Sequence, residues 1–151
     1  MMLNSHKKIV SAVFVVLFVS GALNAKAQTV LDVINDDPRI SDFATAIKET
    51  GLESQLSSGG PYTVFVPSNK AFRKLSGNER SNKELLRNHI ITGSASKRSL
   101  KYMNNITSLS GITIEVVKSN NNSLTIQSYP LVESNIRADN GVVHIIGGVI
   151  K

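Results

Sequence analysis

Apolar residues recur every three or four positions over a stretch that begins near residue 29. This spacing predicts three short helices, over residues 29–35, 40–49 and 52–56. The Asp36-Asp37-Pro38 sequence is expected to separate the first two, because proline cannot continue a helix. Gly51 is expected to end the second helix, since glycine readily adopts the left-handed conformation found at such ends.

One strand and a short helix are predicted next. Residues 62–66 are mainly β-branched or aromatic, and their apolar side chains point to both faces, as in a strand covered on both sides. Pro67 is expected to end this strand, because it cannot donate to a β-ladder. Ser68 or Asn69 is expected to cap a short helix that continues to Leu75.

A further helix is predicted between residues 81 and 93. Ser81 and Glu84 have the spacing of a capping box, in which each side chain bonds the backbone N–H of the other residue. The residues that then share one helical face are Leu85, Leu86, His89 and Ile90. Gly93 is expected to close this helix.

The pattern changes to alternation of apolar and polar residues in the second half. It predicts strands over residues 112–116, 124–127 and 142–146, and residues 149–150 are expected to extend the last strand or to form a further short one. The Asp139-Asn140-Gly141 sequence predicts a tight turn. A mainly helical first half and a mainly stranded second half predict an α+β fold, and no repeat or linker divides it.

The first 27 residues predict a secretion signal. Lys7 and Lys8 precede an apolar run, and Ala25-Lys26-Ala27 has the small-x-small pattern of a cleavage site. The alternative is an uncleaved membrane anchor, but the run is shorter than the roughly 20 residues of a spanning helix. We therefore expect a signal peptide over residues 1–27 and one exported domain over residues 28–151.

Composition and net charge exclude several classes of function. The net charge is +6, but three lysines of the predicted signal supply half of it, which leaves +3 for the exported domain. This ordinary charge does not predict nucleic-acid binding. The absence of cysteine excludes thiol nucleophiles and thiolate metal sites. No long apolar run follows the signal, so we expect no membrane span after cleavage and a secreted, periplasmic or cell-surface location.

Three stretches stand out together. They are TVFVPSNKAF at residues 63–72, LLRNHIITG at residues 85–93 and NGVVHIIGGVI at residues 140–150. In this order they resemble the fasciclin (FAS1) domain family, and the resemblance covers nearly all of the exported domain. It implies a small β-wedge of short strands with several helices packed along it. It also implies a role in adhesion or in contact with matrix, cell surface or other proteins.

The residues of these motifs are interpreted mainly as structural. They are Thr63, Phe65, Pro67, Asn69, Phe72, His89, Asn140, Gly141 and His144. Phe65 and Phe72 are expected in the core, and Asn69 is expected to bond nearby backbone groups at a helix start. Asn140 and Gly141 are expected to supply the positive φ that a tight turn requires.

The sequence predicts no enzyme, no metal site and no cofactor. His89 and His144 are far apart with no acid at ligand spacing, so each is expected to be a buried neutral imidazole bonded to backbone. No serine lies in a nucleophile-elbow sequence, and a hydrolase would need a serine or carboxylate within reach of one of these histidines. Some fasciclin domains carry a Tyr-His pair tied to integrin binding. The matching residues here are Asn88 and His89, so integrin is not expected as a partner.

The best candidate for a contact surface lies within residues 94–104. Its members are Lys97, Arg98, Lys101 and Tyr102. A second basic group, Lys70, Arg73 and Lys74, would extend it into a patch for anionic glycans, and the alternative is an ordinary solvated surface. Asn105 and Asn121 begin formal N-glycosylation sequons. The expected partner is a protein or glycan outside the membrane, and the alternative function is a small-ligand or polysaccharide-binding module without an adhesive role.

Overall fold

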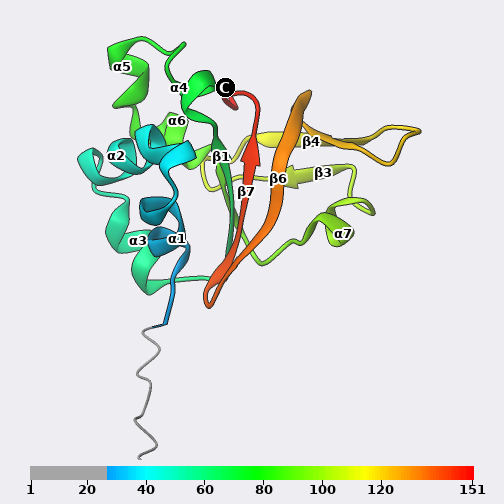
Figure 1. Cartoon of the computed structure of the whole chain (residues 1–151), viewed down its shortest axis with the longest axis horizontal. Helices are drawn as coiled ribbons and strands as arrows, with labels where there is room; N and C mark the ends of the chain where they lie inside the picture. Colours follow the sequence, from blue (N-terminus) through cyan, green and yellow to red (C-terminus); the bar gives the residue numbers. More distant parts are fainter. Residues whose placement is uncertain (1–26) are drawn as a thin grey trace, which may run out of the picture.

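The computed structural model describes residues 27–151, so the predicted signal peptide lies outside the described residues apart from Ala27. Within these residues a seven-stranded sheet forms the centre of the domain, in the order β2-β1-β7-β6-β5-β4-β3 (Figure 1). The strands are β1 Tyr62–Pro67, β2 Ile90–Thr92, β3 Asn105–Thr107, β4 Thr113–Lys118, β5 Leu124–Ile126, β6 Tyr129–Ala138 and β7 Gly141–Ile146. β1 and β7 run parallel, and the other neighbouring strands are antiparallel. The predicted α+β class is confirmed.

The two edge strands, β2 and β3, approach each other at one point. Ile91 and Ser108 form an isolated antiparallel bridge, and the Leu109 N–H donates to the Ile90 carbonyl at 2.8 Å. The sheet therefore curls back on itself into a wedge.

Helices cover one side of the β1 and β7 part of the sheet, and one helix lies apart from them (Figure 1). The covering elements are α1 Val30–Asp36, the 3₁₀ turn η1 Pro38–Ile40, α2 Ser41–Glu49, α3 Glu53–Ser58, α4 Asn69–Phe72, α5 Gly77–Arg80 and α6 Lys83–Arg87. The separate helix, α7 Lys97–Leu100, lies on the side of β6 and β3 (Figure 1). No helix of the described part is long and apolar enough to cross a membrane.

Strand β1 is buried on both faces, as predicted. Val64 and Val66 belong to the apolar cluster beneath the helices, whereas Phe65 belongs to a second cluster inside the wedge. Phe43 and Phe72 join the first cluster, and their rings meet edge to face with centroids 6.0 Å apart. Since β1 separates two dry cores, both of its faces need apolar side chains.

The helix predicted up to Gly93 is shorter than expected. α6 ends at Arg87, and the apolar residues from Ile90 onward form β2, which pairs with β1. A short apolar run fits a helix and a buried strand equally well, and here the hydrogen bonds offered by β1 select the strand. Gly93, with φ of +98°, ends β2 and not the helix.

The capping box was also predicted at the wrong place. Asn82, not Ser81, caps α6, and its Oδ1 accepts from the Glu84 N–H at 3.0 Å. A capping box does form at Ser76 and Glu79, where α5 begins. Glu79 also pairs with the nearby Lys151 ammonium, and this contact, with hydrogen bonds from Ser76, lowers the pKa of Glu79 to about 2.

Pro67 ends β1 as predicted, since it is the last residue of the strand, where it lies opposite Ile146. Two other features of the strand pattern differ from the prediction. Residues 149–150 form no strand, because the Ile150 N–H donates to a ring nitrogen of His89 and not to a neighbouring strand. Strand β6 was not predicted, and its register shifts on either side of Glu133 explain why, since they interrupt the alternation on which strand prediction depends.

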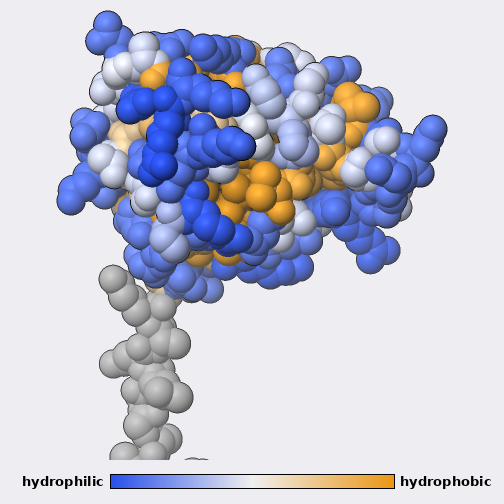
Figure 2. Space-filling model, turned by 45° about the horizontal axis from the view of Figure 1, so that its top comes forward, coloured by the Kyte–Doolittle hydropathy of each residue, from blue (hydrophilic) through white to orange (hydrophobic). Residues whose placement is uncertain are grey.

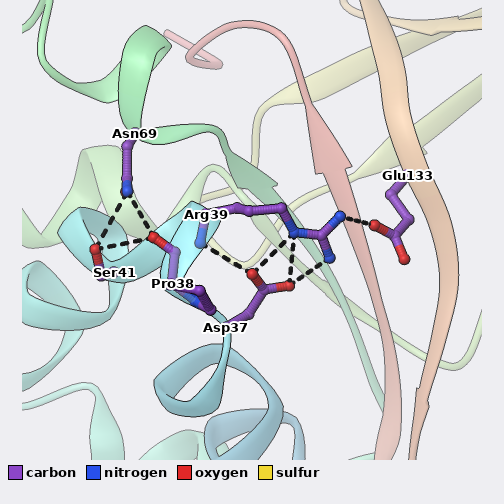
Figure 3. A network of polar contacts seen from close by, with 6 residues as sticks. All are labelled: Asp37, Pro38, Arg39, Ser41, Asn69 and Glu133. Carbon is purple, nitrogen blue, oxygen red and sulfur yellow. Dashed lines mark hydrogen bonds and ion pairs between the residues drawn. The ribbon is translucent and has the colours of Figure 1, made fainter.

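Asn69 does not bond nearby backbone as expected. Its Oδ1 accepts from the Asp42 N–H at 2.9 Å. Its amide donates to the Pro38 carbonyl at 2.9 Å and the Ser41 hydroxyl at 3.2 Å (Figure 3). Helix α2 has no cap of its own at its first residue. Asn69 therefore supplies the missing cap from α4, which joins the two helices.

A second polar contact joins the helical layer to the sheet. The Arg39 guanidinium lies between Asp37 and Glu133 of β6 and pairs with both (Figure 3). The hydrogen bonds from Arg39 lower the pKa of Asp37. Because these side chains are partly exposed, the network contributes little stability, about 1 kcal/mol or less.

Asn140 connects the β6–β7 turn to the helices. Its Oδ1 accepts from the Val30 N–H at 2.7 Å, and its amide donates to the Leu56 carbonyl at 2.9 Å and the Gly59 carbonyl at 3.2 Å. The turn itself needs Gly141, whose φ is +152° and whose missing side chain leaves room for the Tyr62 backbone. The predicted tight turn is present, and Asn140 has a long-range role that its turn position did not indicate.

Candidate functional site

The predicted contact residues form one surface, which we call the α7 surface: Lys97, Arg98, Lys101 and Tyr102. Ser96 caps helix α7, and its hydroxyl accepts from the Ser99 N–H at 3.2 Å. Leu100 is fully buried in the wedge cluster and fixes the helix to the sheet. With Leu100 as its apolar anchor, this short helix leaves Arg98 exposed and Lys97 and Lys101 partly exposed.

Among residues 27–151 the cations of the α7 surface have no acidic partner within ion-pair distance. The ion pairs of the described chain involve Arg39, Arg73, Arg87 and Lys151, and none involves Lys97, Arg98 or Lys101. Tyr102, beside them, is 85% exposed. Figure 2 shows one face of the domain, on which hydrophilic residues surround an exposed apolar area at the centre.

The second basic group does not extend this surface. Lys70 lies in α4, which Figure 1 shows far from α7 across the sheet, and Arg73 and Lys74 directly follow that helix. Arg73 is paired with Asp42 at 2.7 Å. The continuous basic patch considered from the sequence is therefore not formed.

A polar hollow of about 320 Å³ lies between the start of the α7 segment and β6. The residues that give it polar character, and by which we define it, are Ser94, Ser96, Asn135, Arg137 and Asp139. Sequence reasoning missed this hollow. Its only local signal is that Arg137 and Asp139 stand two positions apart, a spacing that puts side chains on one face of a strand.

A second, more apolar hollow of about 280 Å³ lies on the other side of the α7 segment, between β2 and β3. Ile91, Ala95, Met103 and Ile106 line it, and Ser94 borders both hollows. Met103 is 38% exposed there. The segment chosen from the sequence is thus flanked by hollows on two sides.

Both described histidines are buried and bonded to backbone. The His144 Nε2 lies 2.7 Å from the Ala95 carbonyl, and its Nδ1 accepts from the Asn135 N–H at 3.1 Å. Burial lowers the pKa of His144. The neutral ring thereby joins Ala95 and Asn135, which stand on opposite sides of the polar hollow.

His89 is arranged in the same way. Its Nδ1 lies 3.0 Å from the Leu85 carbonyl, and its Nε2 accepts from the Ile150 N–H at 3.0 Å. Burial lowers the pKa of His89 to about 4. The polar partners of both histidines in the described chain are backbone groups, and no cluster of three His, Asp or Glu residues there could hold a metal.

The remaining motif residues face inward. Thr63 donates to the Gly93 carbonyl at 2.6 Å and accepts from the Ala95 N–H at 2.8 Å, which ties β1 to the segment before α7. Asn88, at the position of the family's Tyr-His pair, is buried, and its amide donates to the Ile150 carbonyl at 3.1 Å. This position is therefore not part of the exposed surface.

The two sequon asparagines are exposed in different settings. Asn105 lies in β3, while Asn121 lies in the β4–β5 turn, where its Oδ1 accepts from the Ser123 N–H at 3.1 Å.

Comparisons with known proteins agree on one family. The model of the fasciclin domain matches residues 38–151. Transforming growth factor-beta-induced protein ig-h3 of Sus scrofa is 35% identical over an alignment of 131 residues, and the match covers 82% of this chain but only 19% of that protein. Protein sll1483 of Synechocystis is 29% identical, and the match covers 87% of this chain and 78% of that protein.

A solved structure has the same fold. It is a FAS1 domain pair from the insect cell adhesion molecule fasciclin I, with a TM-score of 0.67 and 18% sequence identity. The match covers 82% of this chain and 51% of that one.

Proposed function

Because this chain belongs to the fasciclin domain family, we propose that it is an exported, non-enzymatic domain that mediates adhesion or another macromolecular contact. It acts at the cell surface, in the periplasm or in the matrix, and it makes the contact through the α7 surface. The observation that carries the proposal is the exposed Tyr102 beside three cations that have no ion-pair partner among the described residues.

Two physical arguments support this surface. Tyrosine is enriched at interfaces, because its ring offers a large apolar area and its hydroxyl a hydrogen bond. Unpaired cations attract an acidic partner and raise its rate of association. The fold match to an insect cell adhesion molecule supports adhesion as the kind of contact.

The proposal is tested by measuring binding of the exported protein to envelope or matrix material of its host. The variant carries Lys97→Glu, Arg98→Glu and Lys101→Glu. The matched control carries Lys48→Glu, Lys70→Glu and Lys83→Glu, which changes the net charge equally at exposed positions. We expect at least tenfold weaker binding for the α7 variant and near-normal binding for the control. Equal binding by all three proteins would refute the α7 surface.

Export is tested separately by the mass of the mature protein. We expect the N-terminus at Gln28, since the cleavage pattern ends at Ala27. A mature protein that keeps Met1 would contradict the predicted signal.

The polar hollow favours a second candidate, a polysaccharide-binding module without an adhesive role. Its lining of hydroxyl, amide, guanidinium and carboxylate groups suits a hydroxyl-rich ligand. The two candidates share the α7 segment and differ in whether the ligand also joins the protein to a cell or matrix.

A further inference from the structure

We propose that the polar hollow binds one uronic acid unit of an anionic polysaccharide, whose chain continues over the α7 surface. This inference rests on the proposed function, because it identifies the partner of that same surface. In this proposal the hollow recognises one sugar unit specifically, whereas the cations of α7 attract the negative charge of the rest of the chain.

The hollow is suited in size to one sugar unit. Its volume of about 320 Å³ is at the lower end of the range of small-molecule sites, roughly 300–1,000 Å³. It opens beside Ser94 and Ser96, directly before the cations of α7. A ligand held in the hollow therefore has a path onto the α7 surface.

Four polar groups of the hollow are without partners within the described chain. Within residues 27–151 the Arg137 guanidinium and the Asp139 carboxylate form no ion pair, either with each other or with another residue. The Ser94 hydroxyl forms no hydrogen bond there, and Asn135 uses its Oδ1 but not its amide nitrogen. These groups are free to bind a ligand.

Together these groups select a uronic acid. The planar guanidinium of Arg137 matches a carboxylate, with two parallel hydrogen bonds. The Asp139 carboxylate only accepts hydrogen bonds, so its ligand must donate, as sugar hydroxyls do. An inorganic anion lacks those donors, and a neutral sugar lacks the carboxylate. A uronic acid carries both within one small ring.

The walls of the hollow are held in place before any ligand binds. Asn135 adopts a left-handed φ of +63° at the irregular part of β6, where register shifts turn its side chain toward α7. Its Oδ1 accepts from the Lys97 N–H at 2.8 Å, and its own N–H donates to His144. Such anchoring lowers the entropy that ordering a binding site would cost.

The α7 surface fits the rest of such a chain. Lys97, Arg98 and Lys101 offer positive charge to further carboxylates, and Tyr102 offers an exposed ring against which a sugar ring can pack. An acidic peptide would also meet the cations, and its backbone N–H groups can donate to Asp139, but a chain of Asp and Glu has no ring to pack against Tyr102. The exposed ring of Tyr102 therefore favours an acidic glycan over an acidic peptide.

The test is titration calorimetry of the exported protein with tetragalacturonate as the probe. Maltotetraose, sulfate and tetraglutamate serve as neutral, inorganic and peptide comparisons. We expect tetragalacturonate to bind at least tenfold more tightly than each of them. Tighter or equal binding of tetraglutamate would overturn the proposal in favour of an acidic peptide.

Three variants in the hollow make the test specific. Arg137→Gln is expected to weaken binding of tetragalacturonate at least tenfold. Arg137→Lys keeps the charge but not the planar pair of N–H donors, and it is expected to weaken binding less. Lys118→Gln removes the same charge from an exposed position in β4 and is expected to bind normally.

Asp139→Ala makes the protein more positive, so charge attraction alone predicts tighter binding, whereas recognition of sugar hydroxyls predicts weaker binding. Tighter binding by Asp139→Ala would overturn the proposal.

The proposed function and this inference can fail separately. If the α7 charge reversal removes binding to envelope or matrix material while the hollow variants bind tetragalacturonate like the parent, the uronic acid site is wrong and the contact surface stands. The thermal unfolding midpoint of each variant is also measured. A midpoint equal to that of the parent shows that the variant is folded and that only its binding has changed.

Discussion

The Nε2 of His144 and the carbonyl oxygen of Ala95 lie 2.7 Å apart, and this hydrogen bond joins β7 to the segment that leads into α7. The other ring nitrogen accepts from the Asn135 N–H, so the proton of the neutral ring lies on Nε2. One buried side chain thereby fixes both walls of the polar hollow. The ring also stacks on Phe65, with centroids 5.4 Å apart.

His144→Phe keeps an aromatic ring beside Phe65 but removes both hydrogen bonds. We expect the free energy of unfolding to fall by about 2–4 kcal/mol, because two backbone groups lose their partner. Urea unfolding measures this change. Hydrogen exchange should also become faster at the Lys97 amide, whose acceptor is Asn135. Unchanged exchange there would show that His144 does not hold the α7 segment.

Stability should fall as the pH decreases from 6.5 toward 4. The pKa of buried His89 is lowered to about 4 from an ordinary value of 6.5, so between these values the unfolded chain binds a proton that the folded chain does not. The free energy of unfolding then decreases by up to about 1.4 kcal/mol per pH unit for this residue. His144, whose pKa is also lowered by burial, adds to the slope.

The pH dependence is checked by urea unfolding at several pH values. His89→Gln lowers stability overall but should flatten the slope between pH 6.5 and 4, and a second substitution, His144→Gln, should flatten it further. Glu79, whose pKa is lowered from 4.5 to about 2, adds to the slope only at the acid end of this window, where the unfolded carboxyl begins to bind a proton. An identical slope in parent and double variant would exclude the histidines as its cause.

Asn140→Ala should loosen the attachment of the helices to the β6–β7 turn. Its side chain makes hydrogen bonds to Val30, Leu56 and Gly59, and each is worth about 0.5–1.5 kcal/mol. We expect a loss of about 2–4 kcal/mol in urea unfolding. The control Asn120→Ala, in an exposed turn, should change stability by less than about 0.5 kcal/mol. Similar losses in both variants would contradict this role.

Asn69→Ala should expose the start of α2 without unfolding the sheet. The loss of a helix cap costs about 1 kcal/mol, and the amide bonds to Pro38 and Ser41 add to it. Hydrogen exchange at the Asp42 amide should become faster, while exchange in β7 should stay close to that of the parent. Asn69→Asp keeps the acceptor for Asp42 and should recover protection there. Failure of this rescue would argue against capping by Asn69.

Much of the fold follows from local patterns. Helical spacing of apolar residues predicts α1 and α2, and the continuous apolar run of β1 indicates burial on both faces. Both follow because backbone geometry fixes which positions of a helix or strand share one face. The Asn140-Gly141 pair marks the hairpin turn for a similar local reason. β6 was missed because its irregular register hides the alternation, and the end of α6 was missed because a short apolar run fits both states.

The sequence by itself determined the α+β class, the family and the segment that carries Lys97, Arg98, Lys101 and Tyr102. Only the tertiary structure decided that these cations have no ion-pair partner among the described residues, that Lys70 and its neighbours lie elsewhere, and that Arg137 lines a polar hollow next to Ser96, which directly precedes the cations. It also decided that Asn69, Asn140 and His144 hold distant segments together. The reason is physical: backbone period and turn preference act over a few residues, whereas pairing, burial and cavities depend on which distant segments the folded chain brings into contact.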